Sequence, residues 1–256
     1  MSDRLFDFSG ANALVIGGAS GLGRAIAEAL VTHGARVAIA ARRLEKARGV
    51  ADEINRQTGV AVDACSVDLA SEPSVTDLAA FIDDSFGGRL NIAVNSGGTN
   101  IRNTIDDISL AEFETVQRTN ITGAFLFART VHPYLRKSGW GRLIHITSIF
   151  SSRSFPGRTS YASSKGALLQ LTRTLALEWA TEGITVNAIS PGPIATEMMR
   201  PVIEDPGRAE QFLRRIPMNR FGEPQEVATA ALFLASPASS FVTGADVAVD
   251  GGWMSA

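Results

Sequence analysis

The chain has 256 residues, 45% hydrophobic and 20% charged, a composition typical of a folded globular protein with a sizeable core. Its 24 basic and 26 acidic residues are interspersed and leave a net charge of −2, which argues against a nucleic-acid partner because a phosphate backbone requires a basic surface. The absence of a long apolar run argues against a signal peptide or membrane span, and the lone Cys65 fits a reducing, cytoplasmic location.

Short apolar segments alternate with amphipathic segments along the whole chain, as strands and helices do in α/β proteins. The predicted strands are Ala13–Ile16, Arg36–Ala41, Val60–Val67, Leu90–Asn95, Arg142–Thr147, Ile184–Ile189 and Val247–Val249. The predicted helices are Gly21–His33, Leu44–Thr58, Ser71–Ser85, Leu110–Lys137, Ser160–Thr181 and Glu223–Ala235. Several strands are apolar almost throughout, which is typical of a parallel sheet covered on both faces. The sequence therefore predicts an α/β fold, a doubly wound parallel sheet of Rossmann type, as a single domain over residues 1–256.

The segment from Pro191 to about Met218 interrupts this alternation. It is rich in proline and too long for a simple turn. It follows the carboxyl end of a predicted strand, where open α/β sheets bind their ligands. We expect a mobile substrate lid at about 191–218, and the alternative is an irregular surface helix packed against the core.

A glycine-rich turn, Gly17–Gly23, follows the first predicted strand and opens the first predicted helix. Such a turn lets backbone amides approach a pyrophosphate, which the positive end of the helix attracts. It could also be only a tight connection between strand and helix. In this context we expect a dinucleotide site, with contacts from Gly17, Ser20, Gly21, Leu22 and Gly23.

Arg42 and Arg43 follow the second predicted strand, where an acidic residue would bind the ribose diol of NAD. Guanidinium groups at this position favour the 2′-phosphate of NADP instead. The sequence therefore predicts NADP, with NAD less favoured. The alternative is that both arginines only begin a solvated helix.

Two further strand ends supply candidate cofactor contacts. Asp68 and Leu69 close the third predicted strand, where an aspartate can meet the adenine amino group, although a plain turn would also explain them. Asn95 and Gly97 close the fourth, where small residues let a cofactor pass close to the backbone.

Tyr161 and Lys165 stand four residues apart at the start of a predicted helix and hence on one face of it. A neighbouring ammonium lowers the pKa of a phenol, which can then exchange a proton with a carbonyl oxygen. Ser148, at the end of the preceding strand, could hydrogen-bond the same oxygen. Alone, the Tyr–Lys pair would be no more than a helical surface pair, but with Ser148 and the glycine turn it predicts a catalytic site.

These residues resemble the short-chain dehydrogenase/reductase family in its compact form, over essentially the whole chain. The matching motifs, in the family's order, are Gly17-x-x-x-Gly21-x-Gly23, Asp68, Asn95-x-Gly97-Gly98, Asn120, Ser148, Tyr161-x-x-x-Lys165, Pro191-Gly192 with Thr196, and Val249-Asp250-Gly251-Gly252. The resemblance implies a catalytic tetrad. Asn120 would kink its helix and hold a water, Ser148 would orient the substrate, Tyr161 would be the acid/base, and Lys165 would bind the nicotinamide ribose and lower the Tyr161 pKa.

The resemblance also implies further contacts and an assembly. Pro191, Gly192, Ile194 and Thr196 would cover the nicotinamide, and a homotetramer would form through the two long central helices and the carboxyl-terminal segment. Ile16, where a threonine is usual, removes no reacting group.

The expected activity is interconversion of a ketone and a secondary alcohol with NADP(H), and no metal-ligand spacing is present. The substrate class stays open between a 3-oxoacyl thioester and a gluconate-type sugar or polyol. Gly139 and Leu177 stand where thioester reductases usually carry basic residues. A non-catalytic nucleotide-binding scaffold is the alternative from another class, and the complete tetrad argues against it.

Overall fold

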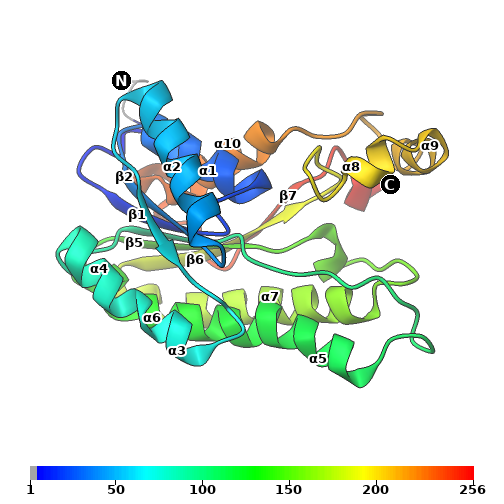
Figure 1. Ribbon diagram of the computed structural model, residues 1–256, viewed down its shortest axis with the longest axis horizontal. Coiled ribbons are helices and arrows are strands. Elements are labelled where there is room, and N and C mark those ends of the chain that lie inside the picture. The colour runs from blue at the N-terminus through cyan, green and yellow to red at the C-terminus, as the bar shows by residue number, and fades with distance from the viewer. Residues whose placement is uncertain (1–4) are drawn as a thin grey trace.

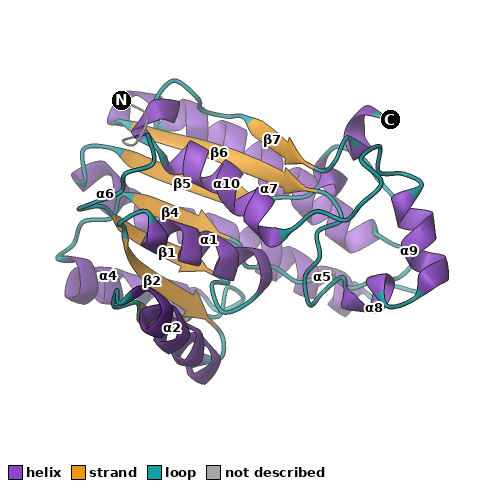
Figure 2. Cartoon of the chain, turned by 90° about the horizontal axis from the view of Figure 1, so that it is seen from above, coloured by secondary structure: helices purple, strands orange, loops and turns teal. Residues whose placement is uncertain are grey.

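The computed structural model describes residues 5–256 and contains one seven-stranded sheet, all of whose strand pairs are parallel (Figures 1 and 2). The strands are β1 (Asn12–Ile16), β2 (Arg36–Ala41), β3 (Asp63–Ser66), β4 (Ile92–Asn95), β5 (Gly141–Ile146), β6 (Ile184–Pro191) and β7 (Asp246–Val249). Their spatial order is β3-β2-β1-β4-β5-β6-β7. The order reverses direction between β1 and β4, as the predicted doubly wound, Rossmann-type fold requires.

Helices cover both faces of the sheet (Figure 1). One layer holds α1 (Gly21–Thr32), α2 (Leu44–Thr58) and α10 (Pro224–Ala235). The other holds α3 (Glu72–Thr76), α4 (Leu78–Phe86), α5 (Leu110–Gln117), α6 (Gly123–Lys137) and α7 (Thr159–Glu178). The short helices α8 (Arg200–Ile203) and α9 (Pro206–Leu213) lie beyond one end of the sheet (Figure 2). No helix within residues 5–256 is long and apolar enough to cross a membrane.

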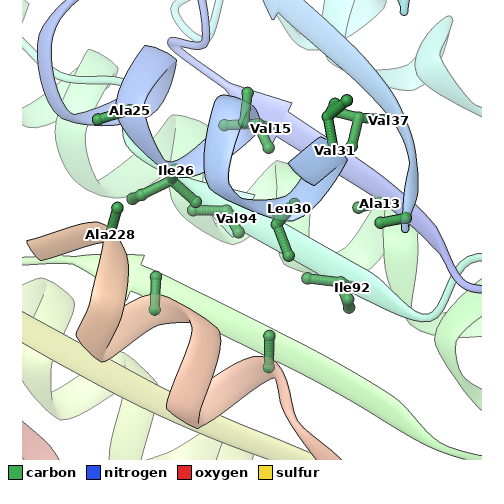
Figure 3. Packing of buried hydrophobic residues seen from close by; sticks show 14 of the residues in the cluster. Ala13, Val15, Ala25, Ile26, Leu30, Val31, Val37, Ile92, Val94 and Ala228 are labelled. Atoms are coloured by element: carbon green, nitrogen blue, oxygen red, sulfur yellow. The ribbon is translucent and has the colours of Figure 1, made fainter. Parts of the chain in front are cut away.

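The apolar face of α1 shows how these layers pack. Ile26 and Leu30 are fully buried between the sheet and α10, facing Val94 and Ala228 (Figure 3). Burying such a side chain contributes about 1.5–3 kcal/mol. Ile26 and Leu30, four residues apart on α1, therefore fix the helix between the sheet and α10, and its amino end, which follows the glycine turn, lies at the carboxyl end of β1.

Several predicted elements differ from the structure in their bounds: β4 begins at Ile92 instead of Leu90, and α7 ends at Glu178 instead of Thr181. Three other differences change the path of the chain. The third strand begins at Asp63 instead of Val60, because Gly59 ends α2 in a left-handed conformation and residues 60–62 cross from the helix to the sheet edge. The predicted helix 71–85 is two helices that meet at Asp77. The predicted helix 110–137 contains a π-helical turn, Arg118–Thr122, between α5 and α6.

Candidate active site

A cavity of about 1010 Å³ opens at the carboxyl ends of the strands. Its walls come from the turn after β1, the loops after β2, β3 and β4, the start of α7, and the segment between β6 and α9. Met198, Met199 and Phe212 also line it. The segment predicted as a lid therefore borders the cavity and is partly helical, in α8 and α9.

The glycine turn forms one wall of this cavity. Gly17, Ser20, Gly21 and Leu22 line it. Gly23 does not, and its role is packing: a Cβ there would lie 2.4 Å from the Gly17 carbonyl oxygen. Close approach of the helix to the turn therefore requires glycine at this position.

The predicted phosphate-binding residues lie at the neighbouring loop. Arg42 and Arg43 are exposed and line the cavity, as does Lys46 from the first turn of α2. The Lys46 ammonium lies 3.4 Å from the Glu197 carboxylate in the lid segment. Sequence reasoning missed Lys46, although its position one helical turn after Arg42 was a usable signal.

Asp68, Leu69 and Gly97 line the cavity, whereas Asn95 does not. Asn95 is buried at the end of β4, and its side-chain oxygen accepts a hydrogen bond from the Gly97 amide at 3.2 Å. It therefore shapes the loop that borders the site. The Asp68 side chain accepts a hydrogen bond from the Ala70 amide at 3.0 Å. This contact is typical of a plain turn, the alternative that the sequence left open for Asp68.

The structure brings Ser148, Tyr161 and Lys165 together on the cavity wall. Ser148 follows β5 with extended backbone, and its hydroxyl accepts a hydrogen bond from the Phe150 amide at 3.2 Å. Tyr161 lies on the first turn of α7 and meets the edge of Phe150, with ring centroids 6.4 Å apart. A strand end and a helix start thus converge on one point, although Ser148 lies 13 positions before Tyr161 in sequence.

Lys165 is almost fully buried, with 4% of its surface exposed. Its ammonium donates a hydrogen bond to the Ile146 carbonyl oxygen at 2.7 Å. Burial lowers the Lys165 pKa to about 8, because removing the ammonium from water disfavours its charged form.

The expected effect of Lys165 on Tyr161 is not found in the protein alone. Burial raises the Tyr161 pKa above its ordinary value of 10 and outweighs the hydrogen bond with Ser148, which lowers it. The cations that lower it are Arg158 and Arg102. Tyr161 is therefore protonated at neutral pH and suited to donate a proton.

Asn120, for which the resemblance implies a kinked helix, lies in the π-helical turn Arg118–Thr122 between α5 and α6. Its amide is fully engaged: the oxygen accepts from the Thr99 amide at 2.8 Å, and the nitrogen donates to the Thr99 carbonyl and the Ser164 hydroxyl, both at 2.9 Å. The side chain does not line the cavity. It ties the loop after β4 to α7, close to the catalytic groups.

Two nucleophilic or titratable side chains are packed rather than placed for chemistry. His145 in β5 is fully buried against Thr172, and burial lowers its pKa to about 3, so it is neutral. Burial raises the Cys65 pKa to about 12, which makes its thiol unreactive. Among residues 5–256, no group of three or more histidine, cysteine, aspartate or glutamate residues is arranged to hold a metal ion.

The chain is similar to known oxidoreductases over nearly its full length. A family model described as "Enoyl-(Acyl carrier protein) reductase" matches residues 17–254. A tropinone reductase homolog of Arabidopsis thaliana is 34% identical over 98% of this chain and 95% of its own. The 3-oxoacyl-[acyl-carrier-protein] reductase of Aquifex aeolicus is 35% identical over 93% of this chain and 95% of its own. A gluconate 5-dehydrogenase from Burkholderia cenocepacia, solved in complex with NADP and tartrate, superposes with a TM-score of 0.95 at 33% identity and full coverage of both chains.

The chain therefore belongs to the short-chain dehydrogenase/reductase family and is an NAD(P)-dependent oxidoreductase.

The residues present fit a dinucleotide. Gly98 lies in the loop after β4, where a Cβ would lie 3.3 Å from the Asn120 side chain and 3.6 Å from the Lys165 ammonium. Because glycine has no Cβ, the space between this loop and Lys165 stays open. The four residues implied to cover the nicotinamide also line the cavity: Pro191, Gly192, Ile194 and Thr196.

Proposed function

We propose that the protein interconverts a ketone and a secondary alcohol with NADP(H) as cofactor. The observation that carries this proposal is the convergence of Ser148, Tyr161 and Lys165 on the wall of one cavity that the glycine turn also borders. When bound, the nicotinamide supplies hydride to the carbonyl carbon or accepts it in the reverse direction.

The protein's own residues handle the proton and the orientation. The Ser148 hydroxyl holds the carbonyl oxygen, and the Tyr161 phenol donates its proton to that oxygen as the carbon is reduced. In the reverse direction the phenolate removes the alcohol proton. Lys165 is held by the Ile146 carbonyl, where its ammonium would bind the nicotinamide ribose.

Asn120 contributes by positioning. Its amide fixes Thr99 and Ser164 at the same time, so the β4 loop and α7 stay in register around the reacting groups. The remaining candidate cofactor contacts are those of the glycine turn, Asp68, Leu69, Gly97 and the 191–196 segment.

The preference for NADP over NAD rests on three cations at the end of β2 and the start of α2. Arg42, Arg43 and Lys46 line the cavity, and the loop after β2 offers no carboxylate to bind a ribose diol. A 2′-phosphate accepts charge-assisted hydrogen bonds from such groups. The complex of the Burkholderia cenocepacia relative with NADP is consistent with this preference.

Three expectations remain part of this proposal. The segment 191–218 acts as a lid, supported by Met198, Met199 and Phe212 on the cavity wall. The chain forms a homotetramer, supported by the apolar side chains Phe125 and Leu177, 46% and 82% exposed on α6 and α7. The protein is cytoplasmic.

The test is NADPH oxidation against a panel of ketones, keto-sugars and 3-oxoacyl thioesters, with Tyr161→Phe as the control variant. We expect turnover of at least one class and a loss of about 10²–10⁴-fold in kcat for Tyr161→Phe. NADPH binding without turnover on every class would instead support the non-catalytic scaffold.

A further inference from the structure

Two arginines at the catalytic end of the cavity have no carboxylate partner. Arg158 is buried, with 8% of its surface exposed, and its guanidinium lies over the Phe150 ring, 5.5 Å from the centroid. Arg102 lies on the exposed loop after β4, and both residues line the cavity. Within residues 5–256, neither guanidinium makes a hydrogen bond or an ion pair. By contrast, the surface residues Arg24, Arg200 and Arg220 all pair with glutamates.

The cavity as a whole carries an excess of positive charge. Its described lining contains six cations (Arg42, Arg43, Lys46, Arg102, Arg158 and Lys165) but only two carboxylates, Asp68 and Glu197. Glu197 pairs with Lys46, and Asp68 lies in the loop after β3. Neither carboxylate therefore compensates the catalytic end.

The phosphates of a dinucleotide would not compensate it either. They are expected at the glycine turn and at Arg42, on the β1–β2 side of the cavity, whereas Arg158 directly precedes α7. A buried guanidinium without a counter-charge destabilises the folded protein, because it loses its hydration and gains no partner. Burial and the neighbouring charge of Arg102 accordingly lower the Arg158 pKa. Such an arrangement is retained most readily where a ligand supplies the negative charge.

We propose that Arg158, assisted by Arg102, binds a carboxylate group of the substrate, so that the substrate is a short keto acid or the corresponding hydroxy acid. This inference rests on the proposed function. The carboxylate takes no part in the reaction: the carbonyl carbon gains hydride, its oxygen gains the Tyr161 proton, and the carboxylate is unchanged.

The carboxylate must lie near the reacting carbonyl. Both arginines act electrostatically on the Tyr161 phenol, and the Phe150 ring contacts both Tyr161 and Arg158. Only a few carbon atoms can therefore separate the two groups of the substrate. A planar guanidinium binds a carboxylate through two parallel hydrogen bonds, which also fixes the direction of the chain.

The first test compares short keto acids of different chain length with their neutral methyl amides, using NADPH and the wild-type protein. We expect kcat/KM to be higher for the acid by about tenfold or more, as a charge-assisted hydrogen bond implies. A phosphorylated ketone of similar length distinguishes a carboxylate site from a general anion site. Equal turnover of acid and amide overturns the inference and leaves the proposed function standing. No turnover of any ketone overturns the proposed function itself.

The variants Arg158→Gln, Arg158→Lys and Arg102→Gln test the residues. Arg158→Gln should remove most of the preference for the acid, because KM rises for the acid and not for the neutral amide, whereas any change in kcat through the Tyr161 pKa should be the same for both substrates. Arg158→Lys should restore part of the preference for the acid, because lysine keeps the positive charge but cannot form two parallel hydrogen bonds. The matched control is Arg56→Gln on the exposed end of α2, which removes the same charge far from the cavity. An equal loss for acid and amide would show a structural role and overturn the inference.

Substituting the buried Arg158 could impair folding. Arg102→Gln then still tests the site, because Arg102 is exposed and its substitution should leave the fold intact. A second measurement uses malonate, a dicarboxylate with neither a ketone nor a hydroxyl group, as a competitive inhibitor of amide reduction. We expect inhibition that weakens about tenfold in Arg158→Gln and less in Arg102→Gln. Inhibition that is unchanged in both variants would contradict the proposed site.

Discussion

The Lys165 ammonium donates its hydrogen bond to the Ile146 carbonyl oxygen at 2.7 Å, while it lies 5.7 Å from the centroid of the Tyr161 ring. The last residue of β5 thus holds the lysine beside the phenol. In the protein alone, burial dominates the titration of both groups: it raises the Tyr161 pKa and lowers the Lys165 pKa. Both shifts disfavour the charged form of the group concerned.

The pH dependence of the reaction should follow Tyr161. Its pKa is raised above 10, so the phenol carries its proton at neutral pH. Ketone reduction should be level up to about pH 8, where Lys165 begins to lose the proton with which it binds the ribose, and should fall further as the pH passes the Tyr161 pKa, whereas alcohol oxidation should rise with pH. Initial rates in both directions over a pH series measure this. A reduction rate that falls between about pH 6 and 8 would mean that another group controls the proton.

Ser148→Ala should shift the pH dependence of alcohol oxidation to higher pH. The hydrogen bond with Ser148 lowers the Tyr161 pKa, and its loss should shift the rising limb of alcohol oxidation to higher pH. The same series of oxidation rates, in the variant and the wild type, measures the shift. If kcat falls but the oxidation rate rises over the same pH range as in the wild type, Ser148 binds the substrate and does not affect the Tyr161 pKa.

Lys165→Met should change how stability depends on pH. The wild-type lysine titrates at about 8 when folded and at about 10.5 when unfolded. Below pH 8 both states are protonated and the burial penalty is fully present; between the two values the unfolded state holds the extra proton, so raising the pH stabilises the wild type. From pH 8 to pH 10, the free energy of unfolding of the wild type should therefore rise by roughly 2 kcal/mol relative to that of the variant. Urea denaturation of both proteins at the two pH values measures this, and a constant difference would contradict it.

Arg42→Asp should reverse the cofactor preference. The new carboxylate repels a 2′-phosphate and can bind a ribose diol. We expect the ratio of kcat/KM for NADPH to that for NADH to fall by roughly 10- to 100-fold, since a charge-assisted hydrogen bond contributes about 1.5–3 kcal/mol. Lys46→Ala should lower the ratio less, because Lys46 already has Glu197 as a partner. An unchanged ratio in Arg42→Asp would place the phosphate elsewhere.

Gly23→Ala and Gly49→Ala form a matched pair. At Gly23 the new methyl group would lie 2.4 Å from the Gly17 carbonyl oxygen, whereas at Gly49, inside α2, it meets nothing within 4 Å. Gly23→Ala should lower the free energy of unfolding by about 2 kcal/mol or more and weaken NADPH binding. Gly49→Ala should raise it by about 0.5–1 kcal/mol, because alanine loses less backbone entropy in a helix. Thermal melts and NADPH titrations of both variants check this. Equal stability of the two would contradict the close packing at Gly23.

Much of the fold could be predicted from sequence because its signals are local. Near-continuous apolar segments gave the central strands, and amphipathic spacing gave α1, α2 and α10. The edge strand β3 was less well predicted, since it begins only where the chain, after crossing from the end of α2, first pairs with β2, Asp63 lying opposite Ala38. The break at Asp77 and the π-helical turn at Asn120 also depend on contacts between elements. Asn120 is bonded to Thr99 and Ser164, which lie far away in the sequence.

The sequence by itself determined the family resemblance, the glycine turn and the residues of the candidate catalytic site, because each is a short motif with a required spacing. Only the tertiary structure decided the electrostatics. Burial depends on which elements pack around a side chain, so the sequence indicated that Lys165 would lower the Tyr161 pKa, whereas the folded protein assigns that effect to Arg158 and Arg102. These two arginines are 56 positions apart, and only the convergence of the β4 loop and the start of α7 places them together beside the phenol.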